Sequence, residues 1–423
     1  MKVAGTVRAP GDKSITHRAL LLAALGRGVS HVGGALTSLD ARSSARVLRQ
    51  LGAEISPLHQ GRVLVIKGRG RFGAPGRTLN CGNSGTTTRL LLGLLAGHRF
   101  TATLTGDASL RRRPMRRVTA PLTEMGARFE ERGGDGLPLT VCGGKLRPIR
   151  YAMPVSSAQV KSSLLLAGVI GEVPVDLLEP NGRSRDHTER MLRAFGFAVG
   201  EKDGWIEFRP GGRIEPFDIQ VPGDPSSAAF LVGASVLAEG GELRIAGVGV
   251  NPTRTGFLRV LERMGARVAV HESDTSFGEP VADLIARPAT LRGTEVTAGE
   301  IPGLIDEIPM LAVLASRAAG ETIFRDVGEL RIKESDRLGL VAGNIRAVGG
   351  KAEVRGEDLH VEGVERPPRG RVRTAADHRI AMAFAVLGTL PGARITIDDM
   401  ACAAVSFPEF PATLRRIGAG RSR

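Results

Sequence analysis

Several basic residues in this chain stand at the start of apolar stretches, where a charge is costly to bury. The motif GDKSITHR contains Lys13, Ser14 and Arg18 and leads directly into a run of leucine and alanine. Two like charges can be buried at such a place only if an anion or a carboxylate compensates them. The motif therefore indicates an anion-binding site, with the alternative that both side chains extend to solvent at a domain edge.

A comparable pattern recurs in the second half of the chain. RIKESDR supplies Lys333, Glu334 and Arg337, and DHR supplies Arg379 before another apolar run. Lys333 and Arg337 are four residues apart, so they share one face if the segment is helical. Taken together, the basic groups at helix starts in both halves predict an interdomain cleft that binds two anions.

One carboxylate is a candidate base. LIDEIP places Asp306 between apolar residues, and burial disfavours the charged form of a carboxylate and so raises its pKa. The simpler interpretation is a helix N-cap, a position that aspartate favours, and both roles can coexist.

Four further motifs are weaker when taken singly. CGNSGTTTR, with Asn83 and Gly85, is similar to a phosphate-cradling turn but lacks the GK[ST] ending, so a structural cap is at least as good an interpretation. Arg113 belongs to an arginine run that is typical of a solvated face, although it could also clamp an anion by its fork. VSSAQVKSS contributes hydroxyl, amide and ammonium groups, and SRDHTER alone is typical of a capped surface helix.

The elements that must position these groups follow a repeat. Glycines end six helix-like segments, roughly 70 residues apart, and such a period indicates one supersecondary unit per repeat: Gly52, Gly126, Gly196, Gly265, Gly349 and Gly418. Each is expected to end its helix in the left-handed conformation. Between them lie six segments that are small and aliphatic nearly all round, which predicts helices buried on every side. Their polar residues cluster in the first turn, where free N–H groups and the helix dipole suit anions.

Composition narrows the class of protein. A chain of 423 residues with 42% hydrophobic residues allows two globular domains of three repeats each. The net charge of +14 permits nucleic acid or acidic small molecules as ligands, but one Trp and one Tyr leave few platforms for stacking bases. No apolar run is long enough for a membrane span, and the amino-terminal residues have no signal-peptide core. Three unpaired cysteines fit a reducing cytoplasm, and the histidines show no metal-ligand spacing. We expect a cytoplasmic protein without metal, membrane or nucleic-acid partner.

The ordered motifs together resemble the family of 3-phosphoshikimate 1-carboxyvinyltransferases, also called 5-enolpyruvylshikimate-3-phosphate synthases. GDKSITHRALLLAAL, GNSGTTTRL, RRPM, SSAQVKS, SRDHTE, IDEIP, KESDRL, DHRIAM and SFPEF occur in the family's order. The resemblance implies an α/β fold of two domains, each with three βαβαββ units and buried parallel helices, an inside-out α/β barrel. It implies one domain at residues 13–224, a second at 1–12 with 225–423, and hinge strands near 12 and 224.

The resemblance also implies the reaction. Such enzymes transfer the enolpyruvyl group of phosphoenolpyruvate to the 5-hydroxyl of shikimate-3-phosphate through a tetrahedral intermediate and release phosphate. Carried over by motif, the shikimate-3-phosphate ligands would be Lys13, Ser14, Arg18, Ser156, Ser157, Gln159, Arg185, Asp306 and Lys333. Those of phosphoenolpyruvate would be Lys13, Asn83, Gly85, Arg113, Gln159, Arg337 and Arg379. Asp306 would be the base, with Lys13 and Glu334 as proton donors or relays. No cofactor is implied, and we expect a monomer.

Three positions depart from the best-known pattern of the family. Val405 stands where many members have lysine, Glu329 where many have asparagine, and Ser84 where others have alanine. These differences are similar to the family's second subgroup and suggest reduced sensitivity to glyphosate, the inhibitor of this family. The alternatives are the sister enzyme that uses UDP-N-acetylglucosamine, an RNA-binding or RNA-end-processing protein on related repeats, and an inactive binding module. The sister enzyme lacks the GDKSITHR and KESDR patterns. An RNA-binding protein would be expected to have its arginines along one stripe, which this chain does not show. An inactive module would not need the complete set of ionisable groups.

Overall fold

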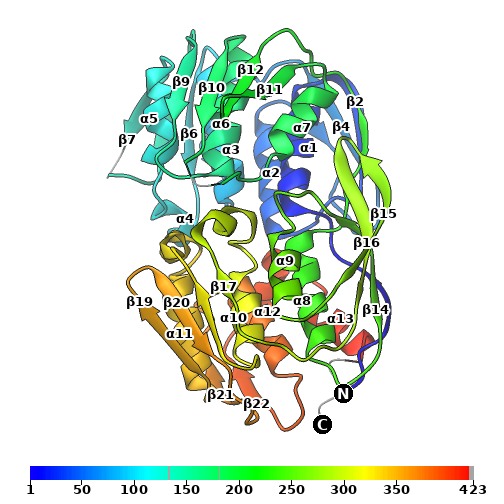
Figure 1. Ribbon diagram of the computed structural model, residues 1–423. Coiled ribbons are helices and arrows are strands. Elements are labelled where there is room, and N and C mark those ends of the chain that lie inside the picture. Colours follow the sequence, from blue (N-terminus) through cyan, green and yellow to red (C-terminus); the bar gives the residue numbers. More distant parts are fainter. Residues whose placement is uncertain (132–133, 181, 419–423) are drawn as a thin grey trace. The chain divides into compact units, whose positions relative to one another are not determined.

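The computed structural model describes residues 1–131, 134–180 and 182–418, and it divides into two compact units (Figure 1). The inserted unit comprises Gly11–Val221 together with Ser276–Glu279. The terminal unit comprises Met1–Pro10, Pro222–Thr275 and Pro280–Arg423. The chain therefore passes between the units after Pro10 and after Val221, and again at both ends of the short segment 276–279.

Three repeats build the inserted unit. The first consists of β13 (Asp218–Gln220), α1 (Lys13–Leu25), β2 (Arg27–Gly33), α2 (Leu39–Gln50), β3 (Glu54–Ile55) and β4 (Leu64–Arg69). The second consists of β5 (Leu79–Asn80), α3 (Gly85–Ala96), β6 (Thr101–Thr105), α4 (Ala108–Arg111), α5 (Arg116–Glu124), β7 (Arg128–Glu131) and β8 (Leu139–Cys142). The third consists of β9 (Ile149–Ala152), α6 (Ala158–Gly171), β10 (Val175–Leu178), α7 (His187–Ala194), β11 (Ala198–Lys202) and β12 (Trp205–Arg209).

The terminal unit also contains three repeats, but the last lacks the third and fourth strands of the predicted βαβαββ plan among the described residues. Its first repeat consists of β1 (Gly5–Arg8), α8 (Pro225–Val236), β14 (Leu243–Gly249), α9 (Gly256–Arg263), β15 (Ala269–Ser276) and β16 (Glu279–Ala286). The second consists of β17 (Glu295–Val296), η1 (Ala298–Gly303), α10 (Ile308–Ala315), β18 (Glu321–Phe324), η2 (Gly328–Ile332), α11 (Arg337–Ala347), β19 (Lys351–Arg355) and β20 (Asp358–Glu362). The third consists of β21 (Arg369–Val372), α12 (His378–Leu387), β22 (Arg394–Ile397), η3 (Ala401–Val405) and α13 (Phe410–Arg416), with a two-stranded sheet among the described residues.

All the four-stranded sheets have the same strand order, for example β5-β6-β8-β7. The first and second strands of a repeat are parallel, and the fourth strand pairs antiparallel with the second. In the opening repeat of each unit, the first strand comes from a distant part of the chain. Gly5 of β1 pairs with Leu243 of β14, and Asp218 of β13 pairs with His31 of β2. The strand that precedes α1 in the sequence thus belongs to the terminal unit, and the strand that precedes α8 belongs to the inserted unit. The repeat spacing does not predict this exchange.

The six glycines mark helix ends as predicted. The helices α2, α5, α7, α9, α11 and α13 each end two residues before one of them. All six have positive φ, from 78° at Gly196 to 107° at Gly126. A side chain with a Cβ is disfavoured in this left-handed region, so glycine reverses the chain into the following strand at little cost.

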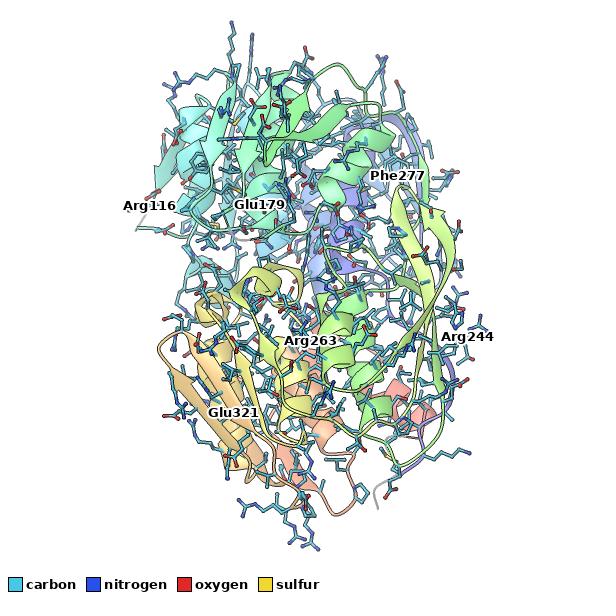
Figure 2. All side chains as sticks on the ribbon, in the orientation of Figure 1. Arg116, Glu179, Arg244, Arg263, Phe277 and Glu321 are labelled. Atoms are coloured by element: carbon cyan, nitrogen blue, oxygen red, sulfur yellow. The ribbon has the colours of Figure 1, made fainter. Side chains whose placement is uncertain are left out.

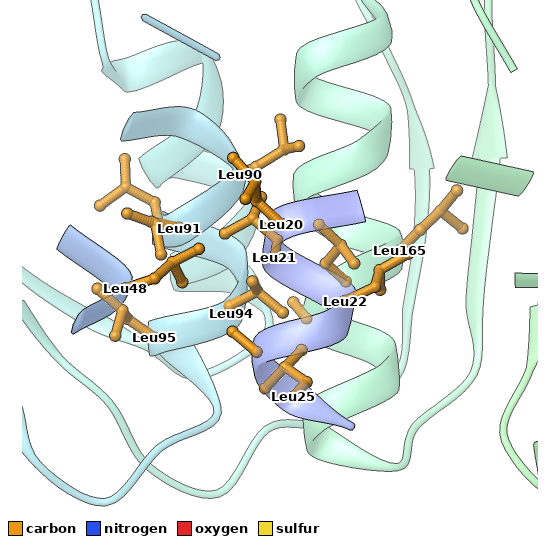
Figure 3. Close-up of a cluster of buried hydrophobic side chains, with 14 of the residues drawn as sticks. Leu20, Leu21, Leu22, Leu25, Leu48, Leu90, Leu91, Leu94, Leu95 and Leu165 are labelled. Atoms are coloured by element: carbon orange, nitrogen blue, oxygen red, sulfur yellow. The ribbon is translucent and has the colours of Figure 1, made fainter. Parts of the chain in front are cut away.

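The six aliphatic segments are buried helices, which confirms the second prediction. They are α1, α3, α6, α8, α10 and α12, and in α8 and α10 every residue is buried. In the inserted unit, leucines of α1, α3 and α6 pack together, among them Leu21, Leu91 and Leu165 (Figure 3). Gly93 allows the backbones of α3 and α6 to approach, because a Cβ there would lie 2.0 Å from the Ser163 carbonyl oxygen. The first turns of α3 and α6 also meet, because Gln159 Nε2 donates to Thr86 Oγ1 at 3.0 Å.

The excess of basic residues lies largely at the surface. Arg116 and Arg244, labelled in Figure 2, are more than half exposed and form ion pairs with Glu131 and Asp283. Exposed pairs of this kind contribute little stability, so these surface arginines have no large energetic role in the fold. No helix in the described part of the chain is long and apolar enough to cross a membrane.

Candidate functional site

The start of α1 carries the first group of predicted residues. Asp12 caps this helix by accepting a hydrogen bond from the Ile15 N–H at 2.8 Å, which satisfies a donor that has no partner within the helix. Lys13 follows, and its Nζ lies 3.4 Å from Asp40 Oδ2. Ser14 Oγ lies 3.5 Å from Arg185 Nη1, so two predicted ligands from distant segments meet here.

Arg18 lies one turn further along α1 and is only 3% exposed. Its Nε donates to Thr188 Oγ1 at 2.7 Å, its Nη2 to Ser162 Oγ at 2.6 Å, and its Nη1 to the Ser14 carbonyl at 2.9 Å. Burial lowers the pKa of Arg18 to about 10, against the opposing effect of Glu189. The guanidinium remains charged at neutral pH and joins α1, α6 and α7 beneath the first turn of α1.

The start of α3 forms a second cluster. Ser84 caps the helix by accepting from the Thr87 N–H, as expected for its position. Arg113, nearly buried, donates from Nη2 to Asn83 Oδ1 at 2.7 Å, and Asn83 Nδ2 donates to Asp107 at 2.7 Å. Gly85 opens the helix beneath this arginine. The structure thus brings together three residues that the sequence placed on the phosphoenolpyruvate side.

Arg89 belongs to the same cluster, although we did not predict it. Its Nη1 donates to Gln159 Oε1 and its Nη2 to the Pro114 carbonyl, while Gln159 Nε2 donates to Thr86 Oγ1 at 3.0 Å. The signal was present in the sequence, because Arg89 follows Gly85 by four residues and must lie on the same face of a helix.

Two predicted serines stand before α6. Ser156 Oγ donates to the Gly182 carbonyl at 3.1 Å. Ser157 is the N-cap residue of α6, in extended conformation at φ −144°, and its hydroxyl makes no capping hydrogen bond in the described structure. A hydroxyl at a helix start without a capping bond can serve a ligand instead.

A buried chain of polar side chains connects α1, α2 and α3. His17 Nδ1 lies 2.7 Å from Ser44 Oγ, Ser44 Oγ lies 2.5 Å from Thr87 Oγ1, and Thr87 Oγ1 donates to Ser84 Oγ at 2.7 Å. Burial, with the positive charges of Lys13 and Arg18, lowers the pKa of His17 to about 3. His17 is therefore neutral in the folded protein at neutral and mildly acidic pH.

This histidine predicts a loss of stability in acid. The unfolded chain takes up a proton on His17 below pH 6.5, whereas the folded chain does so only near pH 3, so stability falls as pH drops through that range. His17→Asn is expected to reduce the loss of unfolding free energy at low pH. Each unit of difference between the folded and unfolded pKa of His17 corresponds to roughly 1.4 kcal/mol. Urea unfolding at pH 8, 6 and 4.5, followed by the fluorescence of Trp205 in the same unit, measures the effect. The exposed His59→Asn in the same unit is the control, and equal pH slopes for wild type and His17→Asn would contradict the prediction.

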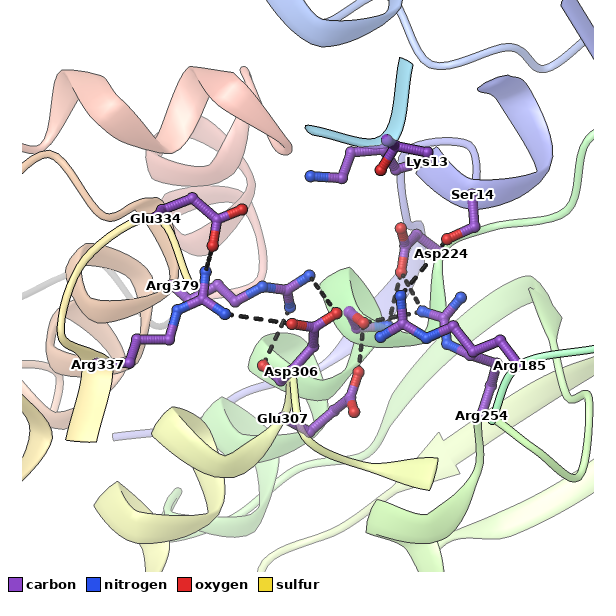
Figure 4. A network of polar contacts seen from close by, with 12 residues as sticks. Lys13, Ser14, Arg185, Asp224, Arg254, Asp306, Glu307, Glu334, Arg337 and Arg379 are labelled. Carbon is purple, nitrogen blue, oxygen red and sulfur yellow. Dashed lines mark hydrogen bonds and ion pairs between the residues drawn. The ribbon is translucent and has the colours of Figure 1, made fainter. Parts of the chain in front are cut away.

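Arg337 is the centre of the charged group in the terminal unit (Figure 4). Its side chain is fully buried and contacts Asp377 at 2.8 Å, Asp306 at 3.2 Å and Glu334 at 2.5 Å. Burial opposes the charged form, but the three carboxylates outweigh it, and the pKa of Arg337 is raised. The charge of Arg337 in turn holds the pKa of buried Asp377 below its usual value. We did not predict Asp377, although its position at the N-cap of α12 was a visible signal.

Asp306 bridges two arginines that lie on different helices. Its carboxylate oxygens face Arg337 Nη1 at 3.2 Å and Arg379 Nη2 at 3.5 Å, and its carbonyl accepts from Arg379 Nη1 at 3.1 Å (Figure 4). The predicted base and the two predicted carboxylate-binding arginines are therefore in direct contact. The carboxylate of Asp306 thus supplies negative charge to both arginines.

Lys333 lies next to this group. Burial lowers its pKa, and the negative charges of Asp306 and Glu329 oppose the shift. Among the described residues, its ammonium group makes no hydrogen bond and no ion pair within 4 Å. Such a partly buried ammonium is a suitable partner for an anionic ligand.

A second buried network contacts the loop of Asp306 through the next residue, Glu307. Ser226 donates to Glu307, and Arg254 contacts Ser226 at 2.9 Å and Asp224 at 3.2 Å (Figure 4). Asp224 caps α8 and donates its own N–H to the Pro10 carbonyl at 2.8 Å. This network was not predicted, because the segments that contain Ser226, Arg254 and Glu307 are far apart along the chain.

Within each unit, then, the structure gathers most predicted residues into compact charged sets. In the described part of the chain, no three histidine, cysteine, aspartate or glutamate side chains are arranged to hold a metal ion. What the sets can do chemically is bind anions and transfer protons between carboxylates, lysines and a ligand.

Comparison with known proteins defines the class to which this fold and these residues belong. The enolpyruvyl transferase NikO from Streptomyces tendae superposes with a TM-score of 0.78, covering 99% of this chain and 95% of NikO, at 18% identity, which shows the shared fold. The structure of an EPSP synthase from Acinetobacter baumannii superposes with a TM-score of 0.86 at 38% identity, covering 98% of this chain and 96% of its own. The fold is that of the enolpyruvyl transferases.

Sequence relatives define the family. The model of the EPSP synthase family, described as 3-phosphoshikimate 1-carboxyvinyltransferase, matches residues 1–414. A 3-phosphoshikimate 1-carboxyvinyltransferase from Alkalilimnicola ehrlichii is 48% identical over 410 residues, covering 96% of this chain and 91% of the relative. A 3-phosphoshikimate 1-carboxyvinyltransferase from Gloeobacter violaceus is 48% identical over 420 residues, covering 98% of this chain and 97% of the relative. This chain belongs to the EPSP synthase family.

Proposed function

We propose that this chain transfers the enolpyruvyl group of phosphoenolpyruvate to the 5-hydroxyl of shikimate-3-phosphate and releases phosphate, a step of the shikimate pathway toward aromatic amino acids. The observation that carries the proposal is the contact of Asp306 with Arg337 and Arg379, in a chain that belongs to the family over nearly its whole length. A base and a pair of guanidinium groups are what addition of a hydroxyl to an anionic enol phosphate requires.

We assign the ligands by substrate. Shikimate-3-phosphate is bound by Lys13, Ser14, Arg18, Ser156, Ser157, Gln159, Arg185, Asp306 and Lys333. Phosphoenolpyruvate is bound by Lys13, Asn83, Gly85, Arg113, Gln159, Arg337 and Arg379. The contacts of Ser14 with Arg185 and of Asn83 with Arg113 support these groupings.

The geometry suggests how the base becomes available. The carboxylate of phosphoenolpyruvate is an anion of the same type as Asp306 and is expected to replace it at Arg337 and Arg379. Asp306 then accepts the proton of the 5-hydroxyl as the new C–O bond forms, while Lys13 or Glu334 protonates the methylene carbon. In the elimination, the methyl carbon returns a proton to one of these basic groups, the C–O bond to phosphate breaks and the C=C bond forms again, which leaves the enolpyruvyl ether. Arginine and lysine groups stabilise the developing charge of the departing phosphate.

Phosphate release tests the proposal. Purified protein is incubated with phosphoenolpyruvate and either shikimate-3-phosphate or UDP-N-acetylglucosamine, in the presence of a chelator. Release only with shikimate-3-phosphate supports the proposal, whereas release only with the nucleotide sugar would assign the chain to the sister reaction. Retained activity with the chelator is expected because we propose neither metal nor cofactor. A glyphosate titration in the same assay tests the reduced sensitivity suggested by Ser84, Glu329 and Val405.

Gly85 gives a prediction about the phosphoenolpyruvate side. A Cβ at this position would lie 3.2 Å from Arg113 Nη1, closer than most Cβ contacts, and the guanidinium would have to move by a few tenths of an ångström. Gly85→Ala is therefore expected to raise the KM for phosphoenolpyruvate about threefold to tenfold with little change in Tm, since the affected group is the end of a flexible side chain. Steady-state kinetics with either substrate varied checks this. An unchanged KM for phosphoenolpyruvate would contradict the placement of Arg113.

We also propose that the protein acts as a cytoplasmic monomer without nucleic-acid partners. The surface ion pairs of several arginines support the absence of a nucleic-acid partner, because paired charges attract a polyanion less. Light scattering during size-exclusion chromatography measures the mass. Binding of RNA at 0.15 M salt would contradict the proposal.

A further inference from the structure

A buried ion cluster in the inserted unit lies among the residues assigned to shikimate-3-phosphate. Its centre is Lys161, in the first turn of α6. The ammonium group lies 2.9 Å from Glu179 Oε2, 2.9 Å from Glu189 Oε1 and 3.0 Å from the Ser184 carbonyl. The lysine side chain is 0% exposed and the two glutamates 1% and 3%. An ammonium group has three N–H donors, and each has an acceptor here.

The electrostatics show that the lysine is charged. Burial favours the neutral amine, but the negative charges of Glu189 and Glu179 outweigh this effect, and the pKa of Lys161 is raised. Replacing a buried ion cluster by apolar side chains is often neutral or even stabilising. A gain in stability is therefore a weak explanation for this cluster, whereas the positioning of neighbouring residues is a better one.

One arm of the cluster fixes the segment that carries Arg185. Ser184, which precedes it, is held at three points: its N–H donates to Glu179 Oε2 at 3.2 Å, its hydroxyl donates to Glu179 Oε1, and its carbonyl accepts from Lys161. Arg185 Nη1 reaches Ser14 Oγ at 3.5 Å. The position of the Arg185 backbone is thus set by charged groups that a substrate cannot touch.

The other arm fixes Arg18. Glu189 binds Lys161, and its neighbour Thr188 accepts from Arg18 Nε at 2.7 Å and donates to Ser162 Oγ at 2.7 Å. Ser162 follows Lys161 in α6. Adjacent residues of α6 therefore contact adjacent residues of α7: Lys161 binds Glu189, and Ser162 accepts from Thr188 while Arg18 donates to both hydroxyls.

We propose that Lys161 is a positioning residue for shikimate-3-phosphate, acting through Ser184 on Arg185 and through Glu189 on Arg18. It touches no substrate itself and does not serve the phosphoenolpyruvate cluster around Arg113. This inference rests on the proposed function, because it assumes that Arg18 and Arg185 bind shikimate-3-phosphate.

Affinity measurements on Lys161→Met test the inference. The Kd of shikimate-3-phosphate, by calorimetry, is expected to rise at least roughly tenfold, the loss of about one charge-assisted hydrogen bond. The KM for phosphoenolpyruvate at saturating shikimate-3-phosphate should change less than about threefold. Lys161→Arg, which keeps the charge, should recover part of the affinity, and Lys67→Met at an exposed lysine of the same unit is the matched control.

Ser184→Ala keeps the test decisive if Lys161→Met does not fold. It removes one of the three bonds at Ser184 without leaving a buried charge unpaired, and it should raise the same Kd about threefold to tenfold. Folded variants that bind shikimate-3-phosphate as wild type does, or that lose affinity for both substrates equally, would overturn the inference. Wild-type protein that binds no shikimate-3-phosphate would instead refute the proposed function, whatever the variants do.

Discussion

Asp306→Asn is expected to lower kcat by about 10²–10⁴-fold, the usual loss when a general base is removed. The amide has the size of the carboxylate, but it cannot take up the proton of the 5-hydroxyl. The fold should be retained, since Asp306 is partly exposed and Arg337 keeps two other carboxylates. Rapid-quench measurement of a single turnover separates this loss from product release.

Glu307→Gln is the matched control for this variant. Glu307 is the next residue in the same loop, but it accepts a hydrogen bond from Ser226 in the buried network behind Asp306. A glutamine can also accept that bond, so we expect kcat to fall less than about tenfold. If Asp306→Asn retained kcat within tenfold of wild type, another group, with Glu334 the first candidate, would have to be the base.

Arg337→Met is expected to be the most destabilising single change near the site, by about 3–5 kcal/mol, because it leaves three carboxylates without their shared buried cation. Arg379→Met removes a guanidinium that contacts only Asp306 among the ion pairs of the described residues, and it should cost about 0–2 kcal/mol. Both should raise the KM for phosphoenolpyruvate at least roughly tenfold.

Calorimetry compares the two variants, since the single tryptophan lies in the other unit and does not report on this one. Asp377→Asn combined with Arg337→Met should recover part of the lost stability, because it removes one of the unpaired carboxylates. Equal stability of Arg337→Met and Arg379→Met would show that the three contacts of Arg337 carry little energy.

The repeat architecture was predictable from residues that are local in sequence. The residue after a helix often adopts the left-handed conformation, which glycine adopts most easily. The positions of Gly196 and Gly265 therefore predict helix ends. A segment that is apolar on all sides, such as residues 308–315, has to be buried. The exchange of β1 and β13 between the opening repeats was not predictable from spacing, because the paired residues are far apart in the sequence, as for Gly5 with Leu243 and Asp218 with His31.

The candidate site was likewise predictable from the sequence only in part. The sequence by itself determined which groups stand at helix starts, since Lys13, Asp306 and Arg379 each belong to a motif that opens a buried helix. The tertiary structure alone decided the partners: Asp377 for Arg337, Gln159 for Arg89, and two glutamates for Lys161. The physical reason is that capping and periodicity act over one helical turn, whereas the compensation of a buried charge depends on whatever carboxylate the fold brings within about 4 Å.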